Sequence, residues 1–136
     1  MENPSDESLK EILDATETIA SVGLSGNEDK PSHWVGLYLM GEGFHVIPVN
    51  PTVEKILGEK TYPDLESIPD KVDVVQLFRP SEAVMPFVES AIKIGAKVVW
   101  MQEGIVNEEA AEKARAAGLE VVMDACMRAT HRNLCK

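Results

Sequence analysis

The chain of 136 residues is long enough for one domain with its own buried core, and 44% of its residues are hydrophobic. Its 13 basic residues stand against 23 acidic ones, and a net charge of −10 without a concentrated basic patch disfavours nucleic-acid binding. No apolar run approaches the roughly 18 residues of a membrane-spanning helix, and the acidic start lacks a signal core. We therefore expect a soluble cytoplasmic protein that binds neither nucleic acid nor membrane.

The first third of the chain predicts a helix, a strand, a turn and a second helix. Residues 5–15 predict a helix within an N-terminal extension at 1–17, and the apolar segment 18–23 predicts the first strand. After the turn, residues 32–43 have helical spacing, with Ser32 as the N-cap. The buried stripe of this helix is expected to contain Trp34, Val35, Tyr38 and Leu39.

The middle of the chain predicts two more strands and a third helix. Segment 44–50 predicts the second strand and segment 72–78 the third. Between them, residues 51–71 contain three prolines and weak periodicity, which predicts a loop with at most a short helix. The helix predicted at 81–95 contains Pro86, which is expected to bend its first turns.

The last third predicts a strand at 96–102, an alanine-rich helix at 107–118 capped by Asn107, and a strand at 119–123. The five strands are nearly continuous runs of apolar residues, which is typical of strands covered on both faces. Alternating strands and helices predict right-handed crossovers. The fold class is therefore α/β, a Rossmann-like doubly wound parallel sheet of about five strands in a single domain over 1–136.

The turn after the first strand, residues 23–32, has the composition of a phosphate site. Ligands of doubly wound sheets bind beyond the carboxyl ends of the strands, where helix amides point outward. Gly23 permits close backbone approach, Ser25 offers a hydroxyl, and Lys30 brings positive charge. Ser32 heads a helix whose dipole favours an anion. These residues alone leave two alternatives, a phosphate site and an ordinary capped turn.

The sequence departs in two places from the motif that binds dinucleotides in Rossmann folds. Counted from Gly23, G-x-G-x-x-G would need glycines where Ser25 and Glu28 stand. The second strand ends in Asn50 and Pro51, whereas an acidic residue would hold the ribose of NAD. No phosphate-loop motif of the G-x-x-x-x-G-K-[ST] type is present. NAD(P) in the same crevice stays as an alternative ligand.

Six segments carry a more specific pattern: VGLSGNEDKPSHWVGLYL at 22–39, GFHVIPVNP at 43–51, ILGEKTYPDLESIP at 56–69, VDVVQLFRPSEAV at 72–84, AKVVWMQEGIVNEEA at 96–110 and GLEVVMDACMRATHRNL at 118–134. Together they resemble the small stand-alone CoA-binding proteins, whose Rossmann domain is similar to the N-terminal domain of the succinyl-CoA synthetase α subunit. The resemblance covers residues 9–134. It implies that coenzyme A lies across the strand ends, with its pyrophosphate on the first loop.

The resemblance also implies which residues contact the cofactor. Those around the pyrophosphate are Gly23, Leu24, Ser25, Lys30, Pro31 and Ser32. Those farther along the ligand are Asn50 and Pro51 beside the adenosine, and Phe78, Arg79 and Gln102 beside a phosphate or the pantetheine arm. Glu28 and Asp29 are expected to point to solvent, because they would repel an anion.

A catalytic group is harder to find. His33 is expected to be a polar surface residue and His45 to be structural. Asp124, Cys126 and His131 have the residue types of a Cys/His arrangement, which keeps a CoA-dependent enzyme as an alternative. The synthetase relatives carry their ligase chemistry in another domain, so the resemblance favours a non-catalytic binding or regulatory module for CoA or an acyl-CoA.

The two cysteines predict no metal site. Cys126 and Cys135 lack the CxxC spacing of zinc or redox sites and are expected to be thiols. The sequence leaves open the acyl group, the pathway, and whether the protein forms a homodimer or works with a partner enzyme.

Overall fold

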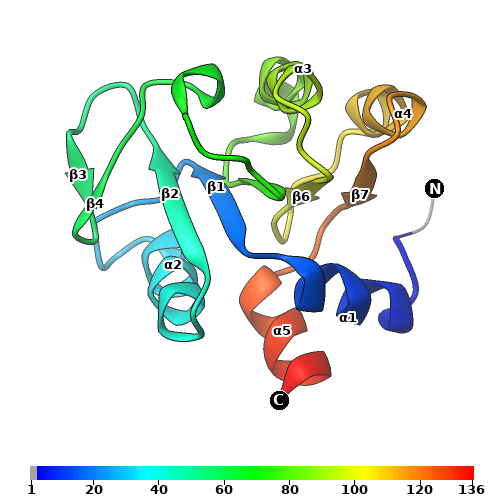
Figure 1. The fold of residues 1–136 in the computed structure, drawn as a ribbon, viewed down its shortest axis with the longest axis horizontal. Helices are drawn as coiled ribbons and strands as arrows, with labels where there is room; N and C mark the ends of the chain where they lie inside the picture. Colours follow the sequence, from blue (N-terminus) through cyan, green and yellow to red (C-terminus); the bar gives the residue numbers. More distant parts are fainter. Residues whose placement is uncertain (1–2) are drawn as a thin grey trace.

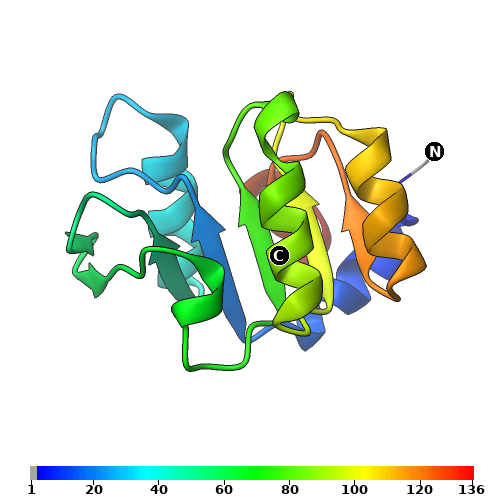
Figure 2. The same ribbon diagram turned by 90° about the horizontal axis from the view of Figure 1, so that it is seen from above.

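A parallel sheet of five strands forms the centre of the protein, for which a computed structural model describes residues 3–136. The strands lie in the order β2-β1-β5-β6-β7, and every neighbouring pair is parallel. Figure 2 shows the arrowheads pointing toward one edge of the sheet. The strands are β1 (Thr18–Val22), β2 (His45–Val49), β5 (Val74–Leu77), β6 (Val98–Met101) and β7 (Glu120–Val122). Each lies inside a predicted segment, so the Rossmann-like α/β fold is confirmed.

Helices cover both faces of this sheet (Figure 1). One face carries α3 (Met85–Lys93) and α4 (Glu108–Ala116), and the other carries α1 (Asp6–Ala15), α2 (Pro31–Gly41) and α5 (Met127–Cys135). Val75 and Val99 belong to the first apolar core, and Val74 and Val98 belong to the second. Successive strand residues face opposite sides, so two apolar cores require continuous apolar strands. None of the helices described is long and apolar enough to cross a membrane.

The stripe predicted for α2 is partly wrong. Val35 and Leu39 are buried as expected, but Trp34 is 47% exposed. Ser32 and His33 are buried instead, because the preceding loop folds back over the first turn of the helix. The helix begins at Pro31, one residue earlier than predicted, so Ser32 is not its N-cap.

The segment predicted as a loop at 51–71 contains a small β-hairpin. Its strands are β3 (Lys55–Ile56) and β4 (Glu59–Lys60), and a short 3-10 helix, η1 (Leu65–Ser67), follows. Leu57 and Gly58 form the turn with φ of 52° and 81°, and positive φ at both central residues is the requirement of a tight type I′ hairpin. The buried side chain of Ile56 anchors the hairpin in the core beneath α2. Two-residue strands are too short to show an alternating pattern.

Pro86 does not bend α3. A 3-10 turn, η2 (Ser81–Ala83), precedes the helix, and Pro86 lies in the first turn of α3, where a missing N–H has no cost. The cap predicted for α4 is confirmed, because Asn107 Oδ1 accepts a hydrogen bond of 2.9 Å from Ala110 N.

A helix lies near each end of the described chain, α1 at the start and α5 at the finish, and these two helices pack together. The helix predicted at 5–15 is confirmed as α1, whereas residues 1 and 2 of the predicted extension lie outside the described residues. The Asn3 side chain exchanges two hydrogen bonds with the backbone of Met123, at 2.7 and 2.8 Å. Helix α5 was not predicted, because most of its side chains are polar and Met127 is its only fully buried residue.

Asp73 ties the start of β1 to the start of β5, and we expect its contribution to stability to depend on pH. Its carboxylate accepts hydrogen bonds from Glu17 N and Thr18 N at 2.9 and 3.0 Å and lies 3.8 Å from Lys97 Nζ. Burial opposes ionisation, but these backbone N–H groups and Lys97 outweigh it and lower the pKa of Asp73 below its ordinary value of 3.8. The stabilisation is therefore complete above pH 3.8 and is lost as the pH falls through the lower folded-state pKa.

Urea denaturation measures this effect directly. Asp73→Ala should cost about 1–2 kcal/mol at pH 7, because two N–H groups lose a charged acceptor. The gap to the wild type should narrow in strong acid. Asp70→Ala is the matched control, since the Asp70 side chain is more exposed than that of Asp73 and its carboxylate lies 3.8 Å from His45 Nδ1. If the difference in unfolding free energy between the wild type and Asp73→Ala is the same at pH 7 and in strong acid, the lowered pKa of Asp73 does not contribute to stability.

Candidate functional site

A cleft of about 750 Å³ lies beyond the carboxyl ends of the strands. It is bounded by the first loop (residues 23–30), the start of α2, the β3–β4 hairpin, and the residues that follow β5 and β6. Strands β1 and β5 are neighbours, but the chain passes from them to helices on opposite faces. Such a switch point leaves a crevice between the two connections, and small-molecule sites occupy roughly 300–1,000 Å³.

Side chains from the first turn of α2 hold the first loop in place. Ser32 Oγ accepts from Ser25 N at 3.1 Å, and His33 Nδ1 donates to Ser25 O at 3.2 Å. Trp34 Nε1 donates to Glu28 O at 2.9 Å. These three residues are consecutive, so the loop and the start of the helix form one preorganised unit.

Several amides of the first loop are already used inside the loop. Ser25, Asn27 and Asp29 each donate their N–H to a nearby side-chain oxygen. In the described part of the chain, four residues that line the cleft have N–H groups without a hydrogen-bond acceptor: Gly23, Leu24, Gly26 and Ser32. Backbone donors and side-chain cations can therefore both attract an anion here.

Gly23 sets how closely the first loop approaches the chain after β5. Its φ is +89°, and a Cβ atom at this position would lie 3.1 Å from Phe78 Cβ. Phe78 is fixed in turn, because its N–H donates to Val22 O at 2.9 Å. Both the backbone conformation and the space available require glycine here.

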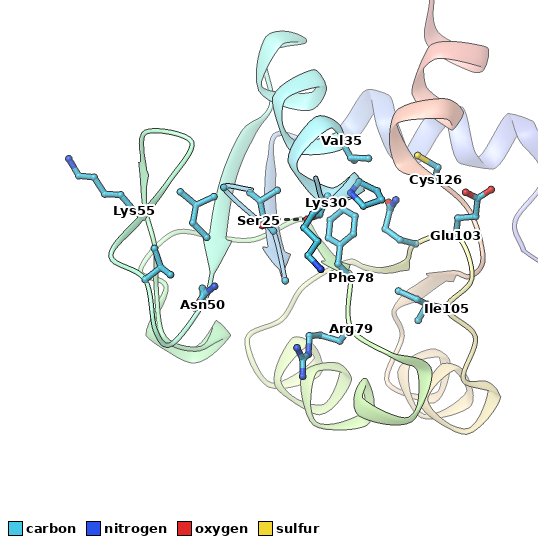
Figure 3. Close-up of a pocket in the computed structure, with 18 residues that line it drawn as sticks. Ser25, Lys30, Val35, Asn50, Lys55, Phe78, Arg79, Glu103, Ile105 and Cys126 are labelled. Carbon is cyan, nitrogen blue, oxygen red and sulfur yellow. Dashed lines mark hydrogen bonds between the residues drawn. The ribbon is translucent and has the colours of Figure 1, made fainter. Parts of the chain in front are cut away.

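Three cationic side chains line the cleft. Lys30 comes from the first loop, Lys55 from the hairpin and Arg79 from the end of β5, and all three residues are exposed. Glu103 is the acidic residue of the lining. Figure 3 shows Lys55 and Glu103 at opposite ends of the site, with Lys30 between them. The Lys55 side chain extends away from the cleft, so Lys30 and Arg79 are the cations that favour an anion here, in a protein with a net charge of −10.

A buried polar chain runs beneath the cleft across the three central strands. Ser21 Oγ donates to Gln76 Oε1 at 2.8 Å, and Gln76 Nε2 donates to Gln102 Oε1 at 3.1 Å. Gln102 Oε1 also accepts from Met127 N at 3.0 Å. Gln102 is only 5% exposed and lines the cleft. Because its carboxamide oxygen already accepts two hydrogen bonds, its NH₂ group is the part of the side chain that can donate to a ligand.

The comparison with known proteins identifies the family. Residues 17–132 match the family model described as the CoA binding domain. The chain belongs to this family. It is 40% identical over 131 residues to the uncharacterized protein YneT of Bacillus subtilis, covering 96% of this chain and 97% of YneT.

Two further relatives of this CoA-binding domain differ greatly in length. A hypothetical protein from Pyrococcus horikoshii OT3 has a solved structure that matches along the whole of both chains, with 43% identity and a TM-score of 0.95. The ADP-forming acetate–CoA ligase II of Archaeoglobus fulgidus is 31% identical over 94 residues, which are 68% of this chain and 14% of the ligase. The family thus occurs both as a small protein and as part of a large enzyme.

Ten of the eleven predicted contact residues line the cleft of this CoA-binding domain. They are Gly23, Leu24, Ser25, Lys30, Pro31, Ser32, Asn50, Phe78, Arg79 and Gln102. Pro51 does not line it and lies in a neighbouring hollow that Asn50 also borders. Asn50 Oδ1 accepts from Thr52 N at 2.8 Å, so the chain turns away directly after β2.

The structure adds lining residues that the sequence analysis missed. Lys55 and Ile56 come from the hairpin, and Glu103, Ile105 and Cys126 form the far end. In the sequence, Gly58 is the residue that could have indicated the hairpin turn. It is preceded by Leu57, whereas such a turn is usually marked by Asn-Gly or Asp-Gly.

The catalytic candidates are dispersed. His33 is buried and bonded to the first loop, so its prediction as a surface residue is wrong. His131 Nδ1 lies 2.9 Å from Tyr38 Oη, and Asp124 Oδ1 accepts from Gly104 N at 2.7 Å. Among residues 3–136, no hydrogen bond joins either side chain to Cys126, and no group of three His, Cys, Asp or Glu residues is arranged to hold a metal ion.

Proposed function

We propose that this protein binds coenzyme A or an acyl-CoA in the cleft, with the phosphates beside Lys30 and Arg79. These two cations come from separate segments and line the same cleft, and their placement carries the proposal. Three further observations support it: the first loop is fixed by a hydrogen bond to Ser32, α2 begins beside the cleft, and the chain belongs to the CoA binding domain family. An anion there gains from the cations and from the helix dipole together.

The adenosine lies on the hairpin side of the cleft in this proposal. Asn50 leaves β2 at that side, and its Oδ1 is bonded to Thr52, so its NH₂ group is the half that can meet a ligand. Val53 and Ile56 supply apolar surface for a base. Pro51 borders the adjacent hollow and would contact the ligand only at its edge.

The protein acts as a binding or regulatory module in this proposal. The residue types that an acyl-transfer site would need do not converge, since His131 is bonded to Tyr38 and packs edge-on against Phe44. The chain matches 14% of the length of the acetate–CoA ligase, so the activity of that enzyme belongs to the larger protein.

Thermal unfolding with CoA, acetyl-CoA, NAD, NADP and ATP in parallel tests the ligand class. A ligand at 100 times its dissociation constant should add roughly 2.7 kcal/mol of stability, which is a readily visible shift in a domain of this size. We expect the shift with CoA and acetyl-CoA. A shift with NAD or NADP and none with either CoA form would replace the proposal by the dinucleotide alternative, although β2 is followed directly by Asn50 and Pro51 and not by an acidic residue.

A further inference from the structure

The two ends of the cleft differ in charge. Lys55 lies at the hairpin end, and Glu103 lies at the opposite end beside Cys126 (Figure 3). A carboxylate repels phosphate, so the phosphates of a bound CoA belong near the cations. The other end of CoA, which carries the thiol, is therefore directed toward Glu103 and Cys126.

The amide group of Gln102 marks the path between these ends. Gln102 is 95% buried, its Oε1 accepts hydrogen bonds from Gln76 and Met127, and its NH₂ group has no protein partner among the residues that the structure describes. The amide nitrogen reaches the solvent of the cleft, and the carbonyl groups of a pantetheine arm can accept its hydrogen bond in place of water. Ile105 and Phe78 line the same part of the cleft with apolar surface.

The Cys126 thiol lies at the end of this path. Cys126 is the residue directly before α5, it is half-buried, and its side chain makes no capping hydrogen bond. It lines the cleft, whereas Cys135 lies at the other end of α5 and its Sγ is 3.9 Å from Asp14 Oδ1. Burial and Asp14 raise the pKa of Cys135, which makes that thiol a poor nucleophile.

We propose that Cys126 is a site of covalent CoA attachment, forming a mixed disulfide with the sulfur of a CoA molecule held in the cleft. The inference rests on the proposed function and extends it to the chemistry of the thiol. The Cys126 thiolate attacks one sulfur of a CoA disulfide, the S–S bond breaks, and the second CoA leaves as a thiolate that takes up the proton lost by Cys126. The exchange needs no further oxidant.

The experiment treats the reduced full chain with CoA disulfide and follows both cysteines by intact-mass and peptide mass spectrometry. Cys126 should react about a hundredfold faster than Cys135, because binding holds the reacting sulfur at high effective concentration. Oxidised glutathione, a disulfide without a nucleotide, should show a much smaller preference, set only by the raised pKa of Cys135. Excess acetyl-CoA should slow the reaction of Cys126, since it occupies the cleft without a disulfide. Cys135→Ser should react as the wild type does, and Cys126→Ser should lose the fast reaction.

Calorimetry of acetyl-CoA with the reduced protein separates the two proposals. If acetyl-CoA binds but CoA disulfide labels Cys126 no faster than Cys135, the covalent site is wrong and the binding function stands. If Cys126 is labelled quickly but acetyl-CoA gives no protection, the reaction does not depend on the cleft and the inference is overturned. If acetyl-CoA neither binds nor protects, both proposals fail.

Discussion

Replacing Lys30 and Arg79 together by alanine should weaken CoA binding about 100-fold, because each lost cation–phosphate contact is worth about 1.4 kcal/mol. The two residues come from different segments and line the same cleft. The free N–H groups of the first loop are unchanged in the variant, so the loss of affinity measures the two side-chain charges. Both side chains are exposed, so the fold should be unaffected. Calorimetric titration with CoA measures the change.

Lys93→Ala with Lys113→Ala is the matched control. It also removes two positive charges, but these lie on α3 and α4 and form surface ion pairs with Glu66 and Glu89. Its affinity for CoA should stay within about twofold of the wild type, since charges beyond a Debye length are screened. Raising the salt concentration should weaken the wild type more than the variant without Lys30 and Arg79. If the wild type and both double variants bind CoA with equal affinity, Lys30 and Arg79 do not contact the phosphates.

Gly23→Ala should cost about 2–4 kcal/mol of folding free energy and should also reduce CoA binding. The left-handed backbone conformation penalises any side chain, and the new methyl group meets Phe78 Cβ at 3.1 Å. Relief of this contact must separate the first loop from the chain after β5, which widens the centre of the cleft. Urea denaturation and calorimetry on the same protein measure the two effects.

Gly26→Ala separates this effect from a general loss of loop flexibility. Gly26 lies three residues later in the same loop and also lines the cleft, but a Cβ there would have no heavy atom within 4 Å. We expect stability within about 0.5 kcal/mol of the wild type. If both variants lose the same stability, the close approach to Phe78 is not the cause.

The sheet could be predicted from the sequence because each strand packs on both faces. Val74 and Val75 lie in different cores, so the apolar run is nearly continuous, with buried Ser21 and Gln76 as polar exceptions, and the signal is strong. Most of the lining residues directly follow the end of a predicted strand or lie at the start of the next helix. Arg79 and Gln102 were predicted from the family resemblance, and their places agree with the rule that the carboxyl ends of parallel strands meet at one edge.

The remaining differences come from tertiary contacts that leave little trace in a single sequence. Ile56 and the turn after it form a hairpin because they pack beneath α2 and not because of local pattern. His33 is buried because a loop folds over it, although its position in the first turn of a helix is usually exposed. Cys126 reaches the cleft only through the placement of α5, a helix with one fully buried side chain.

A crystal structure of the protein grown with excess CoA decides whether the cleft is the CoA site. We expect the diphosphate in contact with Lys30 or Arg79 beside the first loop, and the pantetheine arm running past Gln102 toward Cys126. A cleft closed by the protein's own side chains, with CoA absent or bound at another surface, would contradict it.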